Sequence, residues 1–281
     1  MSSTSRSPRG CRCGAIILLL MLVLAPVSGA AASPEGGCQS AMAEARVLLR
    51  DADADPGAAG RAAALLEQEA PASFRTADCP LLLAEAWYRS ADSDGDIEQT
   101  YPVFEKVRAY AEQALAIEPG RTEAHYWLGL AKLRRAQKIG GIRAFFLVWS
   151  GIRELEQVRA KVPEYDHGGA SRVLSLLYRL APQWTPFGNI DKSVRYALDA
   201  VRISGDYPLN RLYLARSYLK DEKVAAAVEE LRKVIARRAN PFADEARQEL
   251  ARLGQPVSEP AAESALPENA PAMGPPKPAN G

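Results

Sequence analysis

Two acidic segments have the residue types and spacing of a calcium-binding loop. Their aspartates alternate with other residues: Asp51, Asp53, Asp55, Asp92, Asp94 and Asp96. Such a loop also needs glycine at its sixth position and glutamate at its twelfth. The first segment has Pro56 and Ala62 at those positions. The second has its glycine at the fourth position and Val103 at the twelfth. We therefore interpret both segments as turns and helix caps.

Few other side chains are suited to catalysis. His125 and His167 are the two histidines, and neither lies in a metal-ligand motif, whereas zinc sites usually have three or four protein ligands. The nucleophile motif G-x-S-x-G and the phosphate-binding motif G-x-x-x-x-G-K-[ST] do not occur in the sequence. We expect no enzyme activity, no cofactor and no metal site.

The apolar block "AFFLVW" at 144–149 favours binding instead. It is far shorter than the roughly 20 residues of a membrane-spanning helix. Six consecutive apolar residues cover every face of a helix, so one face can pack on its own hairpin while another meets a second hairpin, a partner or a ligand. A fully buried helix is the alternative. Because Gly140, Gly141 and Gly151 flank the block, we expect an extra helix inserted between flexible joints.

A second aromatic cluster lies in the segment "RLAPQWTPFGNID", where prolines stiffen the chain around Trp184 and Phe187. Two interpretations of this loop are open: a loop tucked onto the helices, or a lid or rim beside the Phe-rich helix. Asn189 or Asp191 can cap the helix that follows. The side chains expected to contact a ligand or partner are eight aromatic residues and two arginines: Tyr126, Trp127, Arg143, Phe145, Phe146, Trp149, Arg153, Tyr178, Trp184 and Phe187.

Helical hairpins are the elements that must position these residues. The same three-residue unit recurs in four predicted helices. It has a large apolar residue, then a small residue, and usually an aromatic residue four positions after the first. The units are Leu83-Ala84 with Trp87, Leu128-Gly129 with Lys132, Leu174-Ser175 with Tyr178, and Leu214-Ala215 with Tyr218. The first and last members share a helix face, and the small residue lets a neighbouring helix approach. A second helix ending near Pro or Gly follows each, which predicts an all-α fold of about five hairpins over residues 33–254.

This pattern resembles the tetratricopeptide repeat (TPR). The last unit, which starts at Pro208, matches that family's large and small positions with Leu214, Ala215, Tyr218, Ala227 and Leu231. The earlier units are longer than the family's repeat. The resemblance implies a TPR-like helical-hairpin solenoid, whose curved surface binds peptides, proteins or apolar small molecules.

A narrower resemblance covers the second half of the chain, which is similar to the periplasmic TPR proteins associated with TRAP transporters, the TatT family. The matching residues are Gly169, Ala170, Arg172, Leu174, Leu177, Tyr178, Gly188, Lys192, Ser193, Asn210, Leu212, Leu214 and Ala215. The resemblance implies a periplasmic partner such as a solute-binding protein, and homo-oligomerisation. The alternative is a structural or assembly protein of the cell envelope that binds no small molecule.

Both ends of the chain are expected to lie outside the repeats. Residues 1–32 combine three arginines, an apolar run at 15–24 and small residues, which predicts a cleaved signal peptide and a periplasmic or secreted protein; a retained anchor is the alternative. Residues 255–281 predict a disordered Pro/Ala-rich tail. The whole chain has a net charge of +1. Loss of the three leader arginines takes it to −2, so no strong field favours nucleic acid.

The two cysteines outside the leader, Cys38 and Cys79, predict a disulfide in an exported protein. Each is expected just before the first helix of a hairpin, and such helices run side by side, so their N-terminal ends meet. A bond there would brace one end of the stack, where terminal repeats fray. The alternative is two free thiols.

Overall fold

A computed structural model describes residues 34–50, 52, 55, 57–70, 74–91, 96–237 and 240–256. Over these residues the chain forms eleven α-helices, one short 3₁₀ helix and no strand, which confirms the predicted all-α class. The predicted signal peptide and nearly all of the predicted tail lie outside the described residues. The helices are α1 Pro34–Arg50, α2 Ala58–Gln68, α3 Asp78–Ser90, α4 Ile97–Ile117, α5 Thr122–Ile139, α6 Gly141–Lys161, η1 Tyr165–His167, α7 Gly169–Leu180, α8 Ile190–Ile203, α9 Pro208–Lys220, α10 Val224–Ile235 and α11 Ala243–Arg252.

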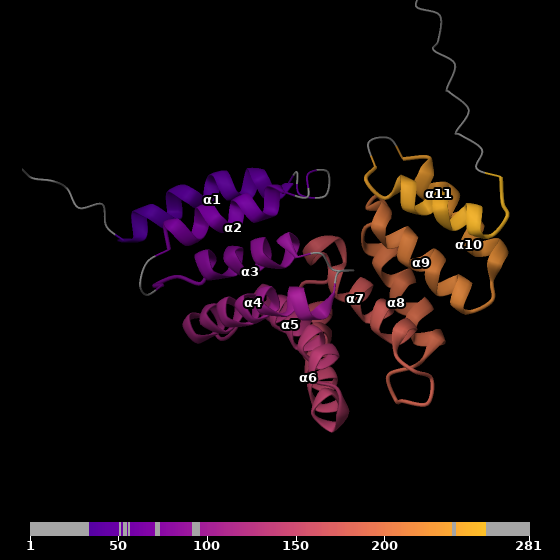
Figure 1. Ribbon diagram of the computed structural model, residues 1–281, viewed down its shortest axis with the longest axis horizontal. Coiled ribbons are helices and arrows are strands. Elements are labelled where there is room, and N and C mark those ends of the chain that lie inside the picture. The colour runs from indigo at the N-terminus through magenta and orange to yellow at the C-terminus, as the bar shows by residue number, and fades with distance from the viewer. Residues whose placement is uncertain are drawn as a thin grey trace, which may run out of the picture. The chain divides into compact units, whose positions relative to one another are not determined.

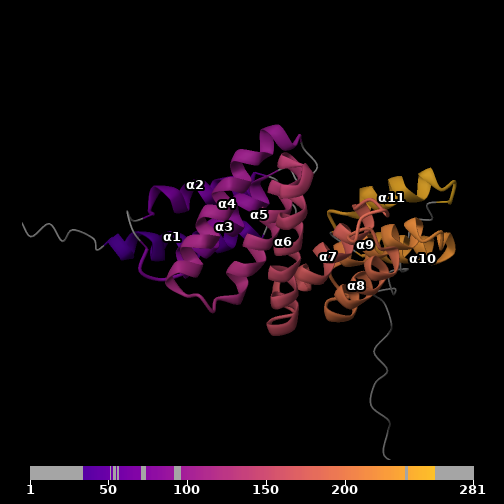
Figure 2. The same cartoon turned by 90° about the horizontal axis from the view of Figure 1, so that it is seen from below.

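Consecutive helices pack against each other in chain order (Figures 1 and 2). Alternate helices also make contact, namely α1 with α3, α3 with α5, and α7 with α9. The first helices of successive hairpins therefore lie beside one another in these three places. Helix α11 was not among the helices predicted from the sequence; it packs on α10 and buries Ala246 and Leu250. None of the described helices is long and apolar enough to cross a membrane.

The small residues of the recurring units lie where helices meet. Ala84, Ser175 and Ala215 are completely buried. At Gly129 the backbones of α5 and α6 come together, because a Cβ atom there would lie 3.3 Å from the carbonyl oxygen of Gly151. A Cβ atom on Gly151 would in turn lie 3.1 Å from the carbonyl oxygen of Gly129. This pair of glycines lets two long helices pack at close range.

The Phe-rich block is the first half of α6, which continues without a break from Gly141 to Lys161. The expected joint at Gly151 is absent, because that glycine lies inside the helix at the contact with α5. The joint before the block does exist. Gly140 and Gly141 have φ angles of +65° and +62°, a conformation that glycine adopts without the steric cost of a side chain.

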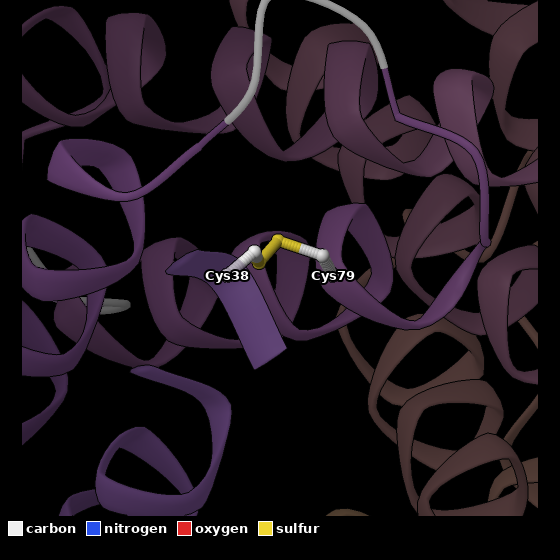
Figure 3. Close-up of a disulfide and its surroundings, with 2 residues drawn as sticks. All are labelled: Cys38 and Cys79. Atoms are coloured by element: carbon white, nitrogen blue, oxygen red, sulfur yellow. A yellow bond between two sulfur atoms is a disulfide. The ribbon is translucent and has the colours of Figure 1, made fainter. Parts of the chain in front are cut away.

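Cys38 of α1 and Cys79 of α3 form a disulfide, with 6.4 Å between their Cα atoms (Figure 3). Both lie inside their helices rather than before them, close to the N-terminal ends, and both are buried. The bond joins the first helices of two successive hairpins, as the sequence predicted.

The acidic segments act as turns and caps wherever the structure describes them. Asp55 accepts a hydrogen bond from the backbone N–H of Gly57 at 2.9 Å and pairs with Arg61. Asp96 is the N-cap of α4 and accepts from the backbone N–H of Glu98 at 3.0 Å. The other four aspartates of the two segments lie outside the described residues.

Candidate binding site

The ten side chains predicted to bind a ligand or partner divide into an exposed group and a buried group. Arg143, Phe145, Phe146, Trp149, Arg153 and Trp184 are exposed, whereas Tyr126, Trp127, Tyr178 and Phe187 are buried. All but one of the exposed residues belong to α6, and Trp184 belongs to the loop between α7 and α8. Burial removes the second group from the surface that a partner could reach.

Four large apolar side chains form a stripe on the first half of α6, here called the aromatic face: Ile142, Phe145, Phe146 and Trp149. Their spacing of three and four residues places them on one side of the helix. Phe146 is 65% exposed and Trp149 is 53% exposed. Both values are high for such large apolar side chains, which bury 150–250 Å² each when they are covered.

The loop between α7 and α8 lies against this face. The ring of Phe187 packs on the ring of Phe145, with centroids 5.1 Å apart, and Phe187 itself is only 7% exposed. Trp184, three residues earlier, is 88% exposed. The loop thus carries one packed ring and one exposed ring, since Phe187 packs on Phe145 of α6 whereas Trp184 is exposed.

Local hydrogen bonds hold this loop in one shape. The backbone N–H and the hydroxyl of Thr185 both donate to the carbonyl of Pro182, at 2.9 and 2.7 Å. Any side chain at Gly188 would overlap that same carbonyl group. Asn189 is the N-cap of α8, as predicted, and accepts from the backbone N–H of Lys192 at 2.9 Å. The position of Trp184 is therefore set by a loop with little freedom.

The buried aromatic residues stabilise the interior. The indole N–H of Trp127 donates to the hydroxyl of Tyr165 at 3.0 Å, and the hydroxyl of Tyr126 donates to Asp166 at 2.6 Å. Tyr178 stacks on Tyr196, with centroids 5.5 Å apart and rings tilted by 8°.

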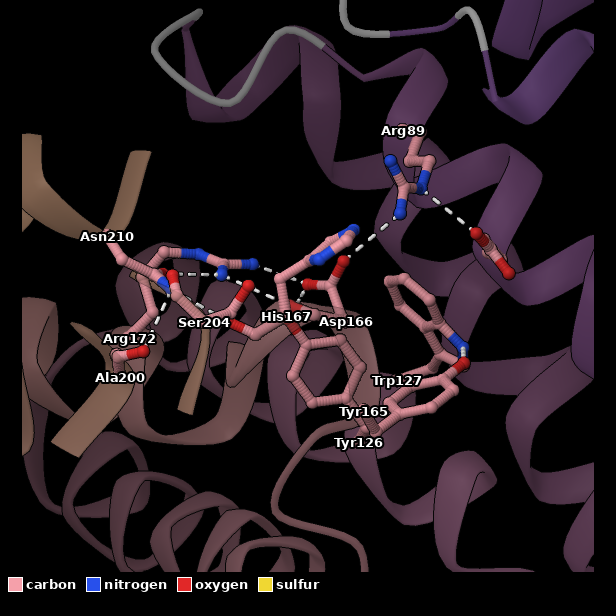
Figure 4. Close-up of polar contacts among 11 residues, drawn as sticks. Arg89, Tyr126, Trp127, Tyr165, Asp166, His167, Arg172, Ala200, Ser204 and Asn210 are labelled. Carbon is pink, nitrogen blue, oxygen red and sulfur yellow. Dashed lines mark hydrogen bonds and ion pairs between the residues drawn. The ribbon is translucent and has the colours of Figure 1, made fainter. Parts of the chain in front are cut away.

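Asp166 in η1 is the centre of a polar network that joins four elements (Figure 4). Its carboxylate accepts hydrogen bonds from Arg89 of α3 at 3.1 Å, from Tyr126 of α5 at 2.6 Å and from Arg172 of α7 at 2.5 Å. Asp166 and His167 have φ angles of +49° and +56°, which residues other than glycine rarely adopt. The network holds this turn in a conformation that it would not favour alone.

Arg172 extends the network to α9. Its guanidinium is buried and donates to the side-chain oxygen of Asn210 at 3.0 Å. The Asn210 amide donates to three backbone carbonyls, among them that of His167 at 2.8 Å. Burial alone would lower the pKa of Arg172, but the negative charge of Asp166 and nearby tyrosines outweigh it and raise the pKa. The guanidinium stays charged and depends on Asp166 for its neutralisation.

An open cavity of about 630 Å³ lies beside this network. Its lining comes from α1, α3, η1 and the residue before α9: Ala43, Arg46, Leu49, Arg50, Leu82, Glu85, Arg89, His167 and Tyr207. A smaller cavity of about 360 Å³ shares Glu85, Arg89 and His167 with it. We call the larger one the arginine-lined cavity. The sequence gives no sign of this cavity, because its lining residues are up to 164 positions apart and form no motif.

Comparisons with known proteins leave the family open. No protein-family model matches the chain, and no curated protein is similar to it. Among the described residues, no group of three or more histidine, cysteine, aspartate or glutamate side chains is placed to hold a metal ion.

Proposed function

We propose that this chain is an exported, TPR-like helical solenoid that acts as a binding or scaffold protein in the periplasm. The aromatic face of α6, together with Trp184, is the proposed contact surface for a partner protein. The observation that carries this proposal is the exposure of Phe146 and Trp149 on α6 and of Trp184 in the loop that packs on α6 through Phe187. The order of the hairpins supports the solenoid, and the disulfide suits an oxidising compartment.

The composition of this surface favours a protein partner. Tryptophan, phenylalanine and arginine are enriched at protein interfaces, and the first two are rarely left exposed together on a monomer. Arg143 and Arg153 are exposed on the same helix and can steer an acidic partner. Because Phe187 braces Phe145 and α6 is continuous, little ordering entropy is lost when a partner binds.

Other occupants of this face are separated by its openness or by the identity of the cross-linked partner. A small apolar ligand is normally enclosed by its site, whereas the aromatic face is open. A second copy of the chain would also cover it, and would then appear as the cross-linked partner. The resemblance to the TatT family favours a solute-binding protein of a TRAP transporter. A role in envelope assembly predicts a different class of partner on the same face.

The test compares partners of the exported protein after cross-linking in the intact periplasm. The double variant Phe146→Ser/Trp149→Ser removes the two most exposed rings of α6, and Val224→Ser is the matched control because Val224 is an exposed apolar residue on α10. We expect one partner, identified by mass spectrometry, to cross-link to the wild type and to the control. Its yield should fall about tenfold or more in the double variant, which corresponds to about 1.4 kcal/mol of binding free energy. Retention of the partner by the double variant would refute the proposal.

A further inference from the structure

We propose that the arginine-lined cavity binds a small organic anion, with its carboxylate or phosphate group held by Arg46 and Arg50. This site shares no residue with the aromatic face of α6, so the two proposals are tested independently of each other. A volume of about 630 Å³ lies within the range of small-molecule sites.

Among the described residues that line the cavity, the charged groups other than these two arginines belong to a chain of ion pairs. Glu85 pairs with Arg89 at 3.0 Å, Arg89 with Asp166 at 3.1 Å, and Asp166 with Arg172 at 2.5 Å. Two carboxylates and two guanidiniums alternate along this chain and their charges cancel. The network therefore provides no spare negative charge for a further cation.

Arg46 and Arg50 lie outside that balance. Both are exposed, and neither forms an ion pair with any residue that the structure describes. They are four residues apart on α1, where like charges share a helix face and repel each other. Burial raises the pKa of Glu85, and the positive charge of nearby Arg46 opposes that rise. Two guanidiniums that line one cavity and form no ion pair with a described residue favour an anion.

The rest of the lining suits the body of such a ligand. The imidazole of His167 stacks on the ring of Tyr207, with centroids 4.5 Å apart and rings tilted by 19°. The guanidinium of Arg172 lies over the Tyr207 ring at 5.1 Å, and Leu49 and Leu82 complete an apolar part of the lining. A planar or aromatic body can lie here while its oxyanion reaches the arginines. Arginine is suited to that contact because its planar fork binds a carboxylate or phosphate through two hydrogen bonds.

Calorimetric titration of the disulfide-intact protein tests this site. The probes are benzoate, phenyl phosphate and inorganic phosphate, with benzamide as a neutral analogue of benzoate. The variant Arg46→Ala/Arg50→Ala removes the two proposed ligand contacts. Its matched control, Arg202→Ala/Arg252→Ala, removes the same charge from two strongly exposed sites on α8 and α11. Circular dichroism checks that each variant is folded.

We expect benzoate or phenyl phosphate to bind the wild type and the control equally, about tenfold or more tightly than the Arg46/Arg50 variant. Benzamide should not bind. The better of the two aromatic probes identifies the oxyanion that the site prefers. Equal binding to the two double variants, or no binding of any probe to the wild type at millimolar concentration, would overturn the proposal. Equal affinity for inorganic and phenyl phosphate would overturn the role given to His167 and Tyr207.

Discussion

Asp166 and Arg172 form a buried ion pair in which carboxylate and guanidinium atoms lie 2.5 Å apart. The pair joins the strained turn of η1 to α7, and Asn210 extends it to α9. Breaking a buried pair leaves one charge without a partner in a medium that solvates it poorly. The stability of this part of the chain should therefore depend on Asp166.

Asp166→Asn removes the charge while keeping a side chain that tolerates a positive φ angle. We expect the free energy of unfolding to fall by about 3 kcal/mol or more, because the charge of Arg172 is then buried without neutralisation. Urea unfolding followed by circular dichroism measures the change. The control is Asp199→Asn, whose closer partner Arg202 is largely exposed and whose second partner Arg159 lies 3.9 Å away, and we expect it to cost about 1 kcal/mol or less. An equal loss of unfolding free energy in the two variants would show that the Asp166 pair stabilises the fold no more than an exposed ion pair does.

Phe187 and Trp184 allow a comparison within one loop. Phe187→Ala removes a buried ring from the contact with Phe145, so we expect a loss of about 3 kcal/mol in unfolding free energy. Trp184→Ala removes a larger ring that is almost fully exposed, and its effect should stay within about 0.5 kcal/mol. Urea unfolding of both variants tests the pair. A larger loss for Trp184→Ala would mean that Trp184 packs in solution.

The disulfide should contribute to stability mainly through the unfolded chain. Cys38 and Cys79 are 41 residues apart, and closing a loop of that length in the unfolded state is worth about 3–4 kcal/mol in the chain-entropy model. Reduction by dithiothreitol should therefore shift the urea midpoint of the wild type downward. The variant Cys38→Ser/Cys79→Ser should start at the lower midpoint and not respond to the reductant. An unchanged wild-type midpoint would contradict the stabilising role.

Alkaline pH should destabilise the fold through its buried phenols. Burial, together with the hydrogen bond to Glu67, raises the pKa of Tyr110 to about 12. The usual pKa of tyrosine is about 10, so the fold favours the neutral phenol. The resulting contribution to the free energy of unfolding is fully present below about pH 10 and is lost as pH rises through about 12. Burial raises the pKa of Tyr126 in the same direction.

The variant Tyr110→Phe isolates one of these groups. At about pH 9 it should be less stable than the wild type by about 1 kcal/mol, because the hydrogen bond to Glu67 is lost. The gap should narrow as pH rises from about 10 to about 12, since the wild type then loses stability that the variant never had. Urea unfolding at several pH values measures the gap. A gap that does not change with pH would contradict the raised pKa.

The sequence by itself determined the helical class, the hairpins, a helix cap at Asn189 or Asp191 and the pairing of Cys38 with Cys79. These features depend on local spacing, on capping and turn residues, and on the fact that first helices of neighbouring hairpins share an end. It left open whether the loop of Phe187 is tucked onto the helices or forms a lid, because that choice depends on the contact with α6.

Only the tertiary structure decided which aromatic residues are available for contact. Tyr126 and Trp127 resemble Phe146 and Trp149 in composition and helical position, yet the first two are buried because η1 and α3 pack over them. The structure also changed the role of Gly151 from a joint to a point of helix contact, and it brought Arg46 and Arg50 to a cavity with His167. Burial and shared cavities are set by neighbours that are distant in the chain, and periodicity along one segment carries no information about them.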